Sequence, residues 1–178
     1  MIWGVTGCVG AGKSTVASIL SGFGARVLDV DDVAAQALAE SGLGLTVAQA
    51  LTAVVTGGAE RACIEAALIP EVQRRVAAWC AESEVPGVLD AALLFEHGLD
   101  RFCSVTLCVC CPTAERRRRV EARSTTSARL FDAIDSSQWP EVEKSRRATH
   151  QVHSLEELTT LLQTVSLSPR APRGRGSG

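Results

Sequence analysis

The sequence predicts an α/β fold of three layers, with a parallel sheet, a helical insertion and a short helical lid. A short apolar run, a Gly-rich turn, a helix-like segment and a second apolar run follow one another within about thirty residues. An alanine-rich stretch without strand-like alternation comes next, and two further apolar runs follow it. Because a strand–helix–strand unit places its two strands parallel, these runs are expected to form one parallel sheet.

The first predicted unit is a strand, a helix and a second strand. Residues 2–6 are apolar and partly β-branched, and Gly7 ends this strand. Residues 13–23 carry apolar side chains at helical spacing, and Gly24 ends the helix. Residues 26–30 (RVLDV) form the second strand.

The rest of the chain is predicted from the same periodicities. The alanine-rich stretch has helical periods, broken at residues 41–44, at Gly57-Gly58 and at Pro70. Ser154, which precedes two glutamates, is a typical helix N-cap. The remaining predicted elements are strands within 85–94, 104–111 and 151–153, and helices that begin at Pro112-Thr113, near residue 126, at Trp139-Pro140 and at Ser154.

Composition narrows the class of protein. The 178 residues suit one domain, and a formal net charge of -2 with 4% aromatic residues argues against a nucleic-acid-binding surface. The N-terminus lacks the pattern of a signal peptide, and no uncharged apolar stretch is long enough for a membrane span. The seven cysteines are odd in number, and Cys108, Cys110 and Cys111 fall in an apolar strand-like run, where cysteine behaves as a small hydrophobe, so we expect reduced, buried thiols. We therefore expect a cytoplasmic monomer that binds neither nucleic acid nor membrane.

Residues 7–14 match the phosphate-binding pattern G-x-x-x-x-G-K-[ST]. Glycines let successive backbone N–H groups converge on phosphate oxygens, and the following helix presents its positive end to the same anion. Lys13 is expected to reach the β- and γ-phosphates of a bound nucleotide, and Ser14 to offer a hydroxyl to Mg²⁺. The predicted nucleotide-binding residues are Gly7, Cys8, Val9, Gly10, Ala11, Gly12, Lys13, Ser14 and Thr15.

Aspartates follow two of the predicted strands. Asp29 and Asp31 end the second strand, and Asp90 follows an apolar run further on. Ligands gather at the carboxyl ends of parallel strands, so a carboxylate there can accept a substrate proton or help to order a metal. Two alternatives stay open. Asp31 or Asp32 can instead be the N-cap of the next helix, and Asp90 can be an ordinary strand-end residue.

Five arginines, at 116–119 and at 123, lie in one charged helix. Charge runs are usually solvated faces, and most of these side chains are expected to lie in water. Arg116, Arg119 and Arg123 nevertheless share one face through spacings of three and four. Such a face suits a lid that closes on phosphates, because arginine stabilises transition-state charge and a closed lid excludes water.

In this order the motifs resemble those of the dephospho-coenzyme A kinase family. Residues 4–15 (GVTGCVGAGKST) are similar to that family's GLTGGIGSGKST, and residues 27–31 (VLDVD) are similar to its VIDAD. Residues 90–96 (DAALLFE) resemble its DIPLLFE, with Ala92 where proline is usual. Residues 138–144 (QWPEVEK) resemble the segment that follows the family's lid arginines.

The resemblance covers roughly residues 2–165 and has two departures. Ile69-Pro70 stands where the family usually has a His-Pro pair. The family's closing segment near the adenine, AD-x-x-I-x-N, is not matched after Ala148-Thr149, because the chain contains no asparagine.

The resemblance implies transfer of the ATP γ-phosphate to the ribose 3′-hydroxyl of dephospho-coenzyme A. It implies that Asp31 is the base for that hydroxyl, and that Lys13 and the lid residues Arg119 and Arg123 neutralise the phosphoryl group. Ser14 would hold Mg²⁺, with Asp90 acting directly or through water. The implied acceptor-binding residues are Asp31, Asp90, Leu93, Phe95 and Glu96.

On this basis the chain divides into three parts and a tail. The tail lacks large apolar residues and is rich in Gly, Pro, Arg and Ser, so we expect it to be disordered. The expected parts are a nucleotide-binding core (1–31, 85–112 and 148–165), a helical acceptor-binding insertion (32–84), a lid with its following helices (113–147) and the tail (166–178).

Other functions stay open. A kinase for another small or nucleotide-like acceptor would share the loop, Asp31 and the lid. An inactive nucleotide-binding homologue would fit the two departures, although Lys13, Ser14, Asp31 and Asp90 are all intact. A GTP-dependent switch is excluded, because its guanine-reading Asn-Lys-x-Asp element requires an asparagine.

Overall fold

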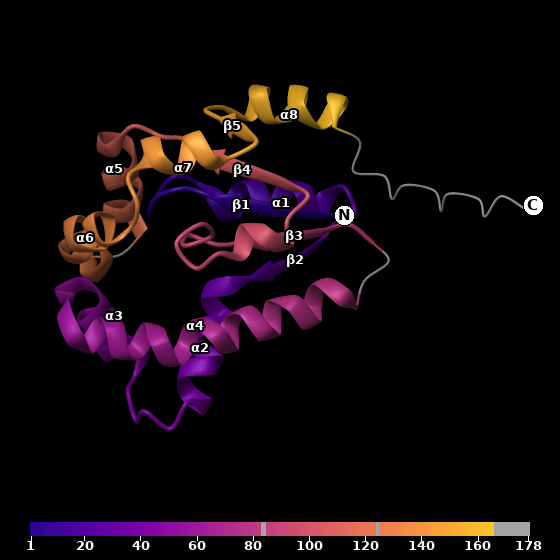
Figure 1. Ribbon diagram of the computed structural model, residues 1–178. Helices are drawn as coiled ribbons and strands as arrows, with labels where there is room; N and C mark the ends of the chain where they lie inside the picture. The colour runs from indigo at the N-terminus through magenta and orange to yellow at the C-terminus, as the bar shows by residue number, and fades with distance from the viewer. Residues whose placement is uncertain (83–84, 124, 166–178) are drawn as a thin grey trace, which may run out of the picture.

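The computed structural model describes residues 1–82, 85–123 and 125–165. Its centre is a sheet of five parallel strands in the order β2-β3-β1-β4-β5, with helices on both faces (Figure 1). The predicted α/β fold with a parallel sheet is therefore confirmed. The strands are β1 (Ile2–Thr6), β2 (Arg26–Asp29), β3 (Gly87–Asp90), β4 (Val105–Val109) and β5 (His150–Val152).

The helices cover the sheet in two groups. Helices α1 and α8 lie on one face, and α2 and α4 lie on the other. The elements are α1 (Lys13–Gly22), α2 (Val30–Glu40), α3 (Val47–Thr56), α4 (Gly58–Ala81), the 3₁₀ helix η1 (Leu99–Phe102), α5 (Thr113–Arg123), α6 (Thr125–Ser137), α7 (Glu141–Arg147) and α8 (Leu155–Thr164).

Alternation along the strands gives the sheet its two apolar faces. Trp3 and Val5 are fully buried and pack in the cluster that includes Leu20 of α1 and Leu158 of α8. Leu89 of β3 points to the other face and packs with residues of α2 and α4. Successive side chains of a strand point to opposite faces, so the apolar runs of this sheet are buried on both sides.

The helical stretch after β2 begins earlier than predicted. Strand β2 ends at Asp29, whose Oδ1 accepts hydrogen bonds from the backbone N–H groups of Asp31 at 2.9 Å and Asp32 at 3.3 Å. Asp29 is therefore the N-cap of α2, and the alternative that Asp31 or Asp32 caps the helix is wrong. Asp31 lies in the first turn of α2 and not at the strand end, because the cap must be the non-helical residue before that turn.

The predicted break at Pro70 is also wrong, because α4 continues through this residue. A proline removes one backbone hydrogen bond from a helix interior. Burial of Val72 and Val76 against the sheet stabilises the helix beyond it. The breaks at residues 41–44 and at Gly57 are confirmed by the ends of α2 and α3.

The seven cysteines are free thiols. Cys8, Cys108, Cys110 and Cys111 are buried, as predicted, whereas Cys63 is exposed. In the part of the chain that the structure describes, no helix is long and apolar enough to cross a membrane. The predicted disordered tail lies outside the described residues.

Candidate active site

The phosphate-binding loop joins β1 to α1 at the carboxyl edge of the sheet. Gly10 has φ +78°, and a Cβ there would lie 2.6 Å from the backbone oxygen of Arg116. Gly12 has φ +105° and is the N-cap of α1. Both positions therefore require glycine. The first turn of α1 contains no acidic residue, so the positive end of the helix is available to an anion.

Four predicted residues meet at this edge of the sheet. Burial raises the pKa of Asp90, and the adjacent Ser14 side chain opposes that rise. Burial also lowers the pKa of Lys13, and the carboxylates of Asp90 and Asp31 oppose that shift. An ammonium and two carboxylates thus share one partly desolvated site, an arrangement typical of catalytic groups.

Asp31 lies at the edge of an apolar cavity of about 240 Å³. The cavity lies between helices α2, α3 and α4 and the loop that follows β3, and Leu93 and His97 of that loop line it. Although the Asp31 side chain is solvent-exposed, the surrounding protein raises its pKa, and the Lys13 ammonium opposes this rise. The structure therefore places Asp31 between the Lys13 ammonium and a cavity suited to an apolar ligand.

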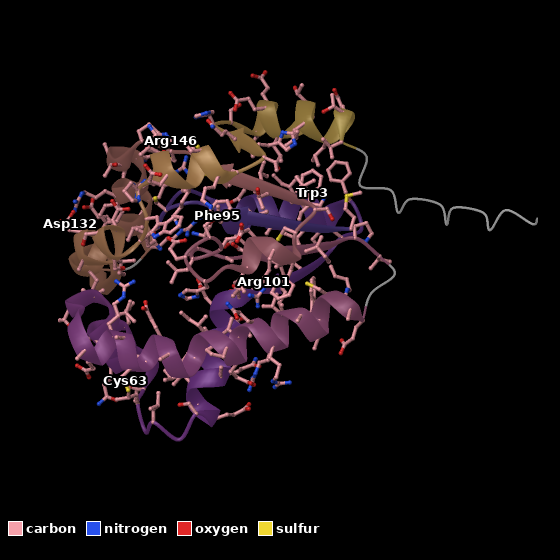
Figure 2. The ribbon with its side chains drawn as sticks, in the orientation of Figure 1. Trp3, Cys63, Phe95, Arg101, Asp132 and Arg146 are labelled. Carbon is pink, nitrogen blue, oxygen red and sulfur yellow. The ribbon has the colours of Figure 1, made fainter. Side chains whose placement is uncertain are left out.

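Two of the predicted acceptor residues lie elsewhere. Phe95 is only 4% exposed and packs in the core on the α2 and α4 face of the sheet, and Figure 2 shows it enclosed by other side chains. Glu96 accepts hydrogen bonds from the backbone N–H of Trp139 at 2.9 Å and from the Lys144 ammonium. The tight turn after β3 directs Leu93 to the cavity and these two side chains to other contacts.

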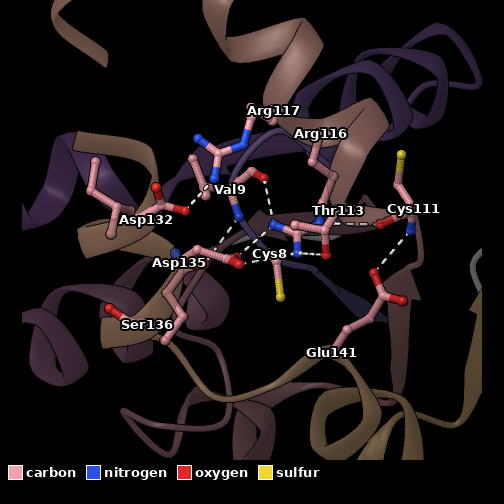
Figure 3. A network of polar contacts seen from close by, with 12 residues as sticks. Cys8, Val9, Cys111, Thr113, Arg116, Arg117, Asp132, Asp135, Ser136 and Glu141 are labelled. Carbon is pink, nitrogen blue, oxygen red and sulfur yellow. Dashed lines mark hydrogen bonds and ion pairs between the residues drawn. The ribbon is translucent and has the colours of Figure 1, made fainter. Parts of the chain in front are cut away.

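The lid arginines divide into two kinds. Arg116 is 4% exposed, and its guanidinium donates to the backbone oxygens of Cys111 and Val9, to the Thr113 hydroxyl and to both carboxylate oxygens of Asp135 (Figure 3). These contacts use all five N–H donors of a guanidinium. The expectation that Arg116 shares a phosphate-facing surface is therefore wrong, because packing against α6 and the loop buries it.

Arg119 and Arg123 are more exposed than Arg116. Both line a second cavity, of about 570 Å³, beside the phosphate-binding loop. Arg119 donates from its Nη1 to the backbone oxygen of Ala11 at 3.2 Å and from its Nε to Glu115 Oε1 at 3.0 Å. The opposite wall includes Val109 of β4 and Val152 of β5. The cavity thus combines loop amides and arginines with an apolar wall, as a nucleotide requires.

Two loop residues are held by the protein itself. Val9 donates its backbone N–H to Gln138 Oε1 at 3.0 Å, and its carbonyl accepts from Arg116. The Cys8 thiol donates to the Trp139 oxygen at 3.7 Å, and burial raises its pKa. The contribution of Gln138 and Trp139 was not predicted, although the QWPEVEK motif contains both.

The oxygen donors at this edge suit a hard cation. The Ser14 hydroxyl and the Asp90 carboxylate are adjacent, and Mg²⁺ prefers such oxygen ligands together with phosphates. Within residues 1–82, 85–123 and 125–165, no group of three or more His, Cys, Asp or Glu side chains is placed to hold a metal. A Mg²⁺ ion at this position would therefore take its remaining ligands from the nucleotide phosphates and water.

Comparisons with known proteins agree with this geometry. The family model described as dephospho-CoA kinase matches residues 1–51 and 44–159. A dephospho-CoA kinase from Thermus thermophilus is 38% identical over 99% of this chain and 96% of its own length. The homologue from Jannaschia sp. is 34% identical over 85% of this chain and 87% of its own.

Solved structures agree on the fold. A Thermus thermophilus protein is 35% identical, with a TM-score of 0.76 over 92% of this chain and 95% of that one. Shikimate kinase from Acinetobacter baumannii, at 13% identity, has a TM-score of 0.59 over 92% of this chain and 91% of its own. The fold and the site thus define a P-loop kinase. The sequence matches are more specific, and the chain belongs to the dephospho-CoA kinase family.

Proposed function

We propose that this protein transfers the γ-phosphate of ATP to the ribose 3′-hydroxyl of dephospho-coenzyme A, giving coenzyme A and ADP. The observation that carries this proposal is the position of Asp31, which interacts with Lys13 of the phosphate-binding loop and lines the apolar cavity of the helical insertion. A base in that position faces a donor on one side and an acceptor on the other. The family membership supports the identity of both.

The two cavities suit the two substrates. The cavity of about 570 Å³ would take ATP, with its phosphates on the loop and its base between the lid and strands β4 and β5. The apolar cavity would take part of the acceptor, with Leu93 among its contacts. In this arrangement residues 32–84 serve acceptor binding and residues 113–147 form the lid region.

Asp31 orients the acceptor hydroxyl and accepts its proton. The hydroxyl oxygen forms a bond to the γ-phosphorus as the bond to the bridging oxygen breaks, and ADP leaves. Lys13, Arg119 and Arg123 donate to the phosphoryl oxygens and stabilise the charge that spreads over them. Ser14 and Asp90 would hold Mg²⁺, which supplies further neutralisation of the phosphates. We also infer that the enzyme acts as a cytoplasmic monomer.

The test is ATP turnover with a panel of acceptors that includes dephospho-coenzyme A, nucleosides and simple sugars. We expect ADP release that depends on dephospho-coenzyme A, with coenzyme A as the second product. A different acceptor that alone supports turnover would indicate another small-molecule kinase. Absence of turnover with every acceptor, together with retained ATP binding, would indicate an inactive homologue.

A further inference from the structure

Lys144 is a buried charge whose contacts the reaction scheme does not use. Its side chain is 0% exposed, and its Nζ donates to the backbone oxygen of Ala92 at 2.7 Å and to the Glu96 carboxylate. Burial of an ammonium costs several kcal/mol unless the charge is paired and hydrogen-bonded. The chain has only one other lysine, Lys13 of the phosphate-binding loop. The Lys144 ammonium is therefore paired and hydrogen-bonded inside the protein, and its partners are Glu96 and the Ala92 carbonyl.

Both contacts of Lys144 lie on the loop that follows β3, residues 91–97, which we call the acceptor-side loop. This loop carries Leu93 and His97 into the apolar cavity. The Ala92 oxygen also accepts from the hydroxyl of Thr6, the last residue of β1, at 3.2 Å. Lys144 and Thr6 thus fix the start of the acceptor-side loop at one carbonyl group.

The segment that ends in Lys144 also holds the phosphate-binding loop. We call residues 138–144 the bridging segment. Gln138 accepts from the backbone N–H of Val9, and the Trp139 oxygen accepts from the Cys8 thiol. The bridging segment therefore contacts the phosphate-binding loop through Gln138 and Trp139. It contacts the acceptor-side loop through Lys144.

Glu96 completes the contact with the acceptor-side loop. Its Oε1 accepts both from Lys144 and from the backbone N–H of Trp139. Its Oε2 is buried and has no hydrogen-bond partner among the described residues. Lys144 is the only cation within 4.0 Å of this carboxylate in the described part of the chain, so its removal would leave Glu96 without a counter-charge.

We propose that Lys144 is a positioning residue for phosphoryl transfer, which holds the acceptor-side loop at the distance from the phosphate-binding loop that in-line attack requires. This inference rests on the proposed kinase function. A misplacement of reacting groups by about 1 Å can cost on the order of 10²-fold in rate. When the contact is lost, water can still hydrolyse the bound ATP, but the acceptor hydroxyl no longer lies in line with the γ-phosphate.

The test uses the double variant Lys144→Met with Glu96→Gln, because Lys144→Met alone would leave an unpaired buried carboxylate. The matched control is Arg146→Met, which removes a cation from the same helix at a side chain that is 70% exposed and lies at the periphery in Figure 2. The measurement is the ratio of coenzyme A formed to ATP consumed with dephospho-coenzyme A as acceptor. This ratio does not depend on how much of the enzyme is folded.

We expect the double variant to lower kcat for acceptor phosphorylation by about 10- to 100-fold, to keep the KM for ATP within about threefold, and to consume more ATP per coenzyme A formed. The Arg146→Met control should match the wild type. A double variant with the wild-type ratio and kcat would overturn the role of Lys144. A fall in kcat with an unchanged ratio would also overturn it, since that result indicates loss of folded enzyme. A wild type that does not phosphorylate dephospho-coenzyme A would overturn the proposed function and the role of Lys144 together.

Discussion

The Ser14 side chain lies beside the Asp90 carboxylate, so the first turn of α1 and the end of β3 meet at one point. The contact is possible because β3 pairs with β1 in the sheet, with Val5 opposite Asp90. The two side chains lie far apart in the sequence and form one set of oxygen ligands in the fold.

This contact leads to a prediction about metal dependence. Asp90→Asn should raise the Mg²⁺ concentration needed for half-maximal activity by about 10-fold or more, because an amide is a weaker ligand and hydrogen-bond partner than a carboxylate. Titration of Mg²⁺ at saturating ATP measures the shift. Asp100→Asn, in η1, is the control and should leave the midpoint unchanged. Equal midpoints for Asp90→Asn and the wild type would exclude Asp90 from the metal site.

Removal of the proposed base should separate chemistry from nucleotide binding. Asp31→Asn should lower kcat by about 10²-fold or more, the range for a positioned general base, while the Kd for ATP stays within about threefold. Asp32→Asn is the matched control, because Asp32 is the adjacent exposed carboxylate in the same helical turn. Near-normal turnover of Asp31→Asn would show that another group accepts the proton.

The acid side of the pH profile should report Asp31. Its surroundings raise the pKa of this carboxyl group above the ordinary value of 3.8. The base acts as a carboxylate, so kcat/KM should fall as the pH drops through the raised pKa, at a pH above 3.8. The limb should be absent from the residual activity of Asp31→Asn. Its persistence in that variant would assign the titration to a different group.

The lid arginines should differ in their effect on nucleotide affinity. Arg119→Ala should raise the KM for ATP by about 10-fold or more, since a hydrogen bond to a charged group contributes about 1.5–3 kcal/mol. Arg118→Ala is the control, because Arg118 is 75% exposed and its side chain pairs only with Glu115 among the described residues. Similar KM values for both variants would contradict the assignment of the second cavity to ATP.

Replacement of Arg116 should lower the stability of the fold. Arg116→Met leaves Asp135 and two backbone carbonyl groups without this donor, and loss of one partner of a buried ion pair costs about 3–5 kcal/mol. The free energy of unfolding from urea titration should fall by an amount in this range, towards its lower end because the Asp135 side chain is 25% exposed. Arg118→Met should change it by less than about 0.5 kcal/mol. A loss below about 1 kcal/mol for Arg116→Met would contradict the structural role.

The phosphate-binding loop was predictable because its chemistry needs particular residues at fixed spacing. The capping residue before α2 was not, since three aspartates lie within four positions and a strand end read from sequence can shift by one or two residues. The helix at Pro70 continues because burial against the sheet outweighs a local signal. Arg116 and Arg119 have the same spacing pattern, and the partners that bury Arg116, Asp135 of α6 and the backbone oxygens of Val9 and Cys111, are distant in sequence or set by the fold.

Gln138 and Arg116 bind the N–H and the carbonyl of the Val9 peptide group. These contacts also constrain the order of folding during synthesis. The ribosome completes the phosphate-binding loop before the groups that hold it, because Arg116 and Gln138 follow Val9 by 107 and 129 residues. The neighbouring strands β3 and β4 are also made later than β1. A nascent chain that stops before Gln138 therefore lacks the acceptor for the Val9 backbone N–H. The conformation of the loop thus depends on residues that are synthesised long after the motif itself.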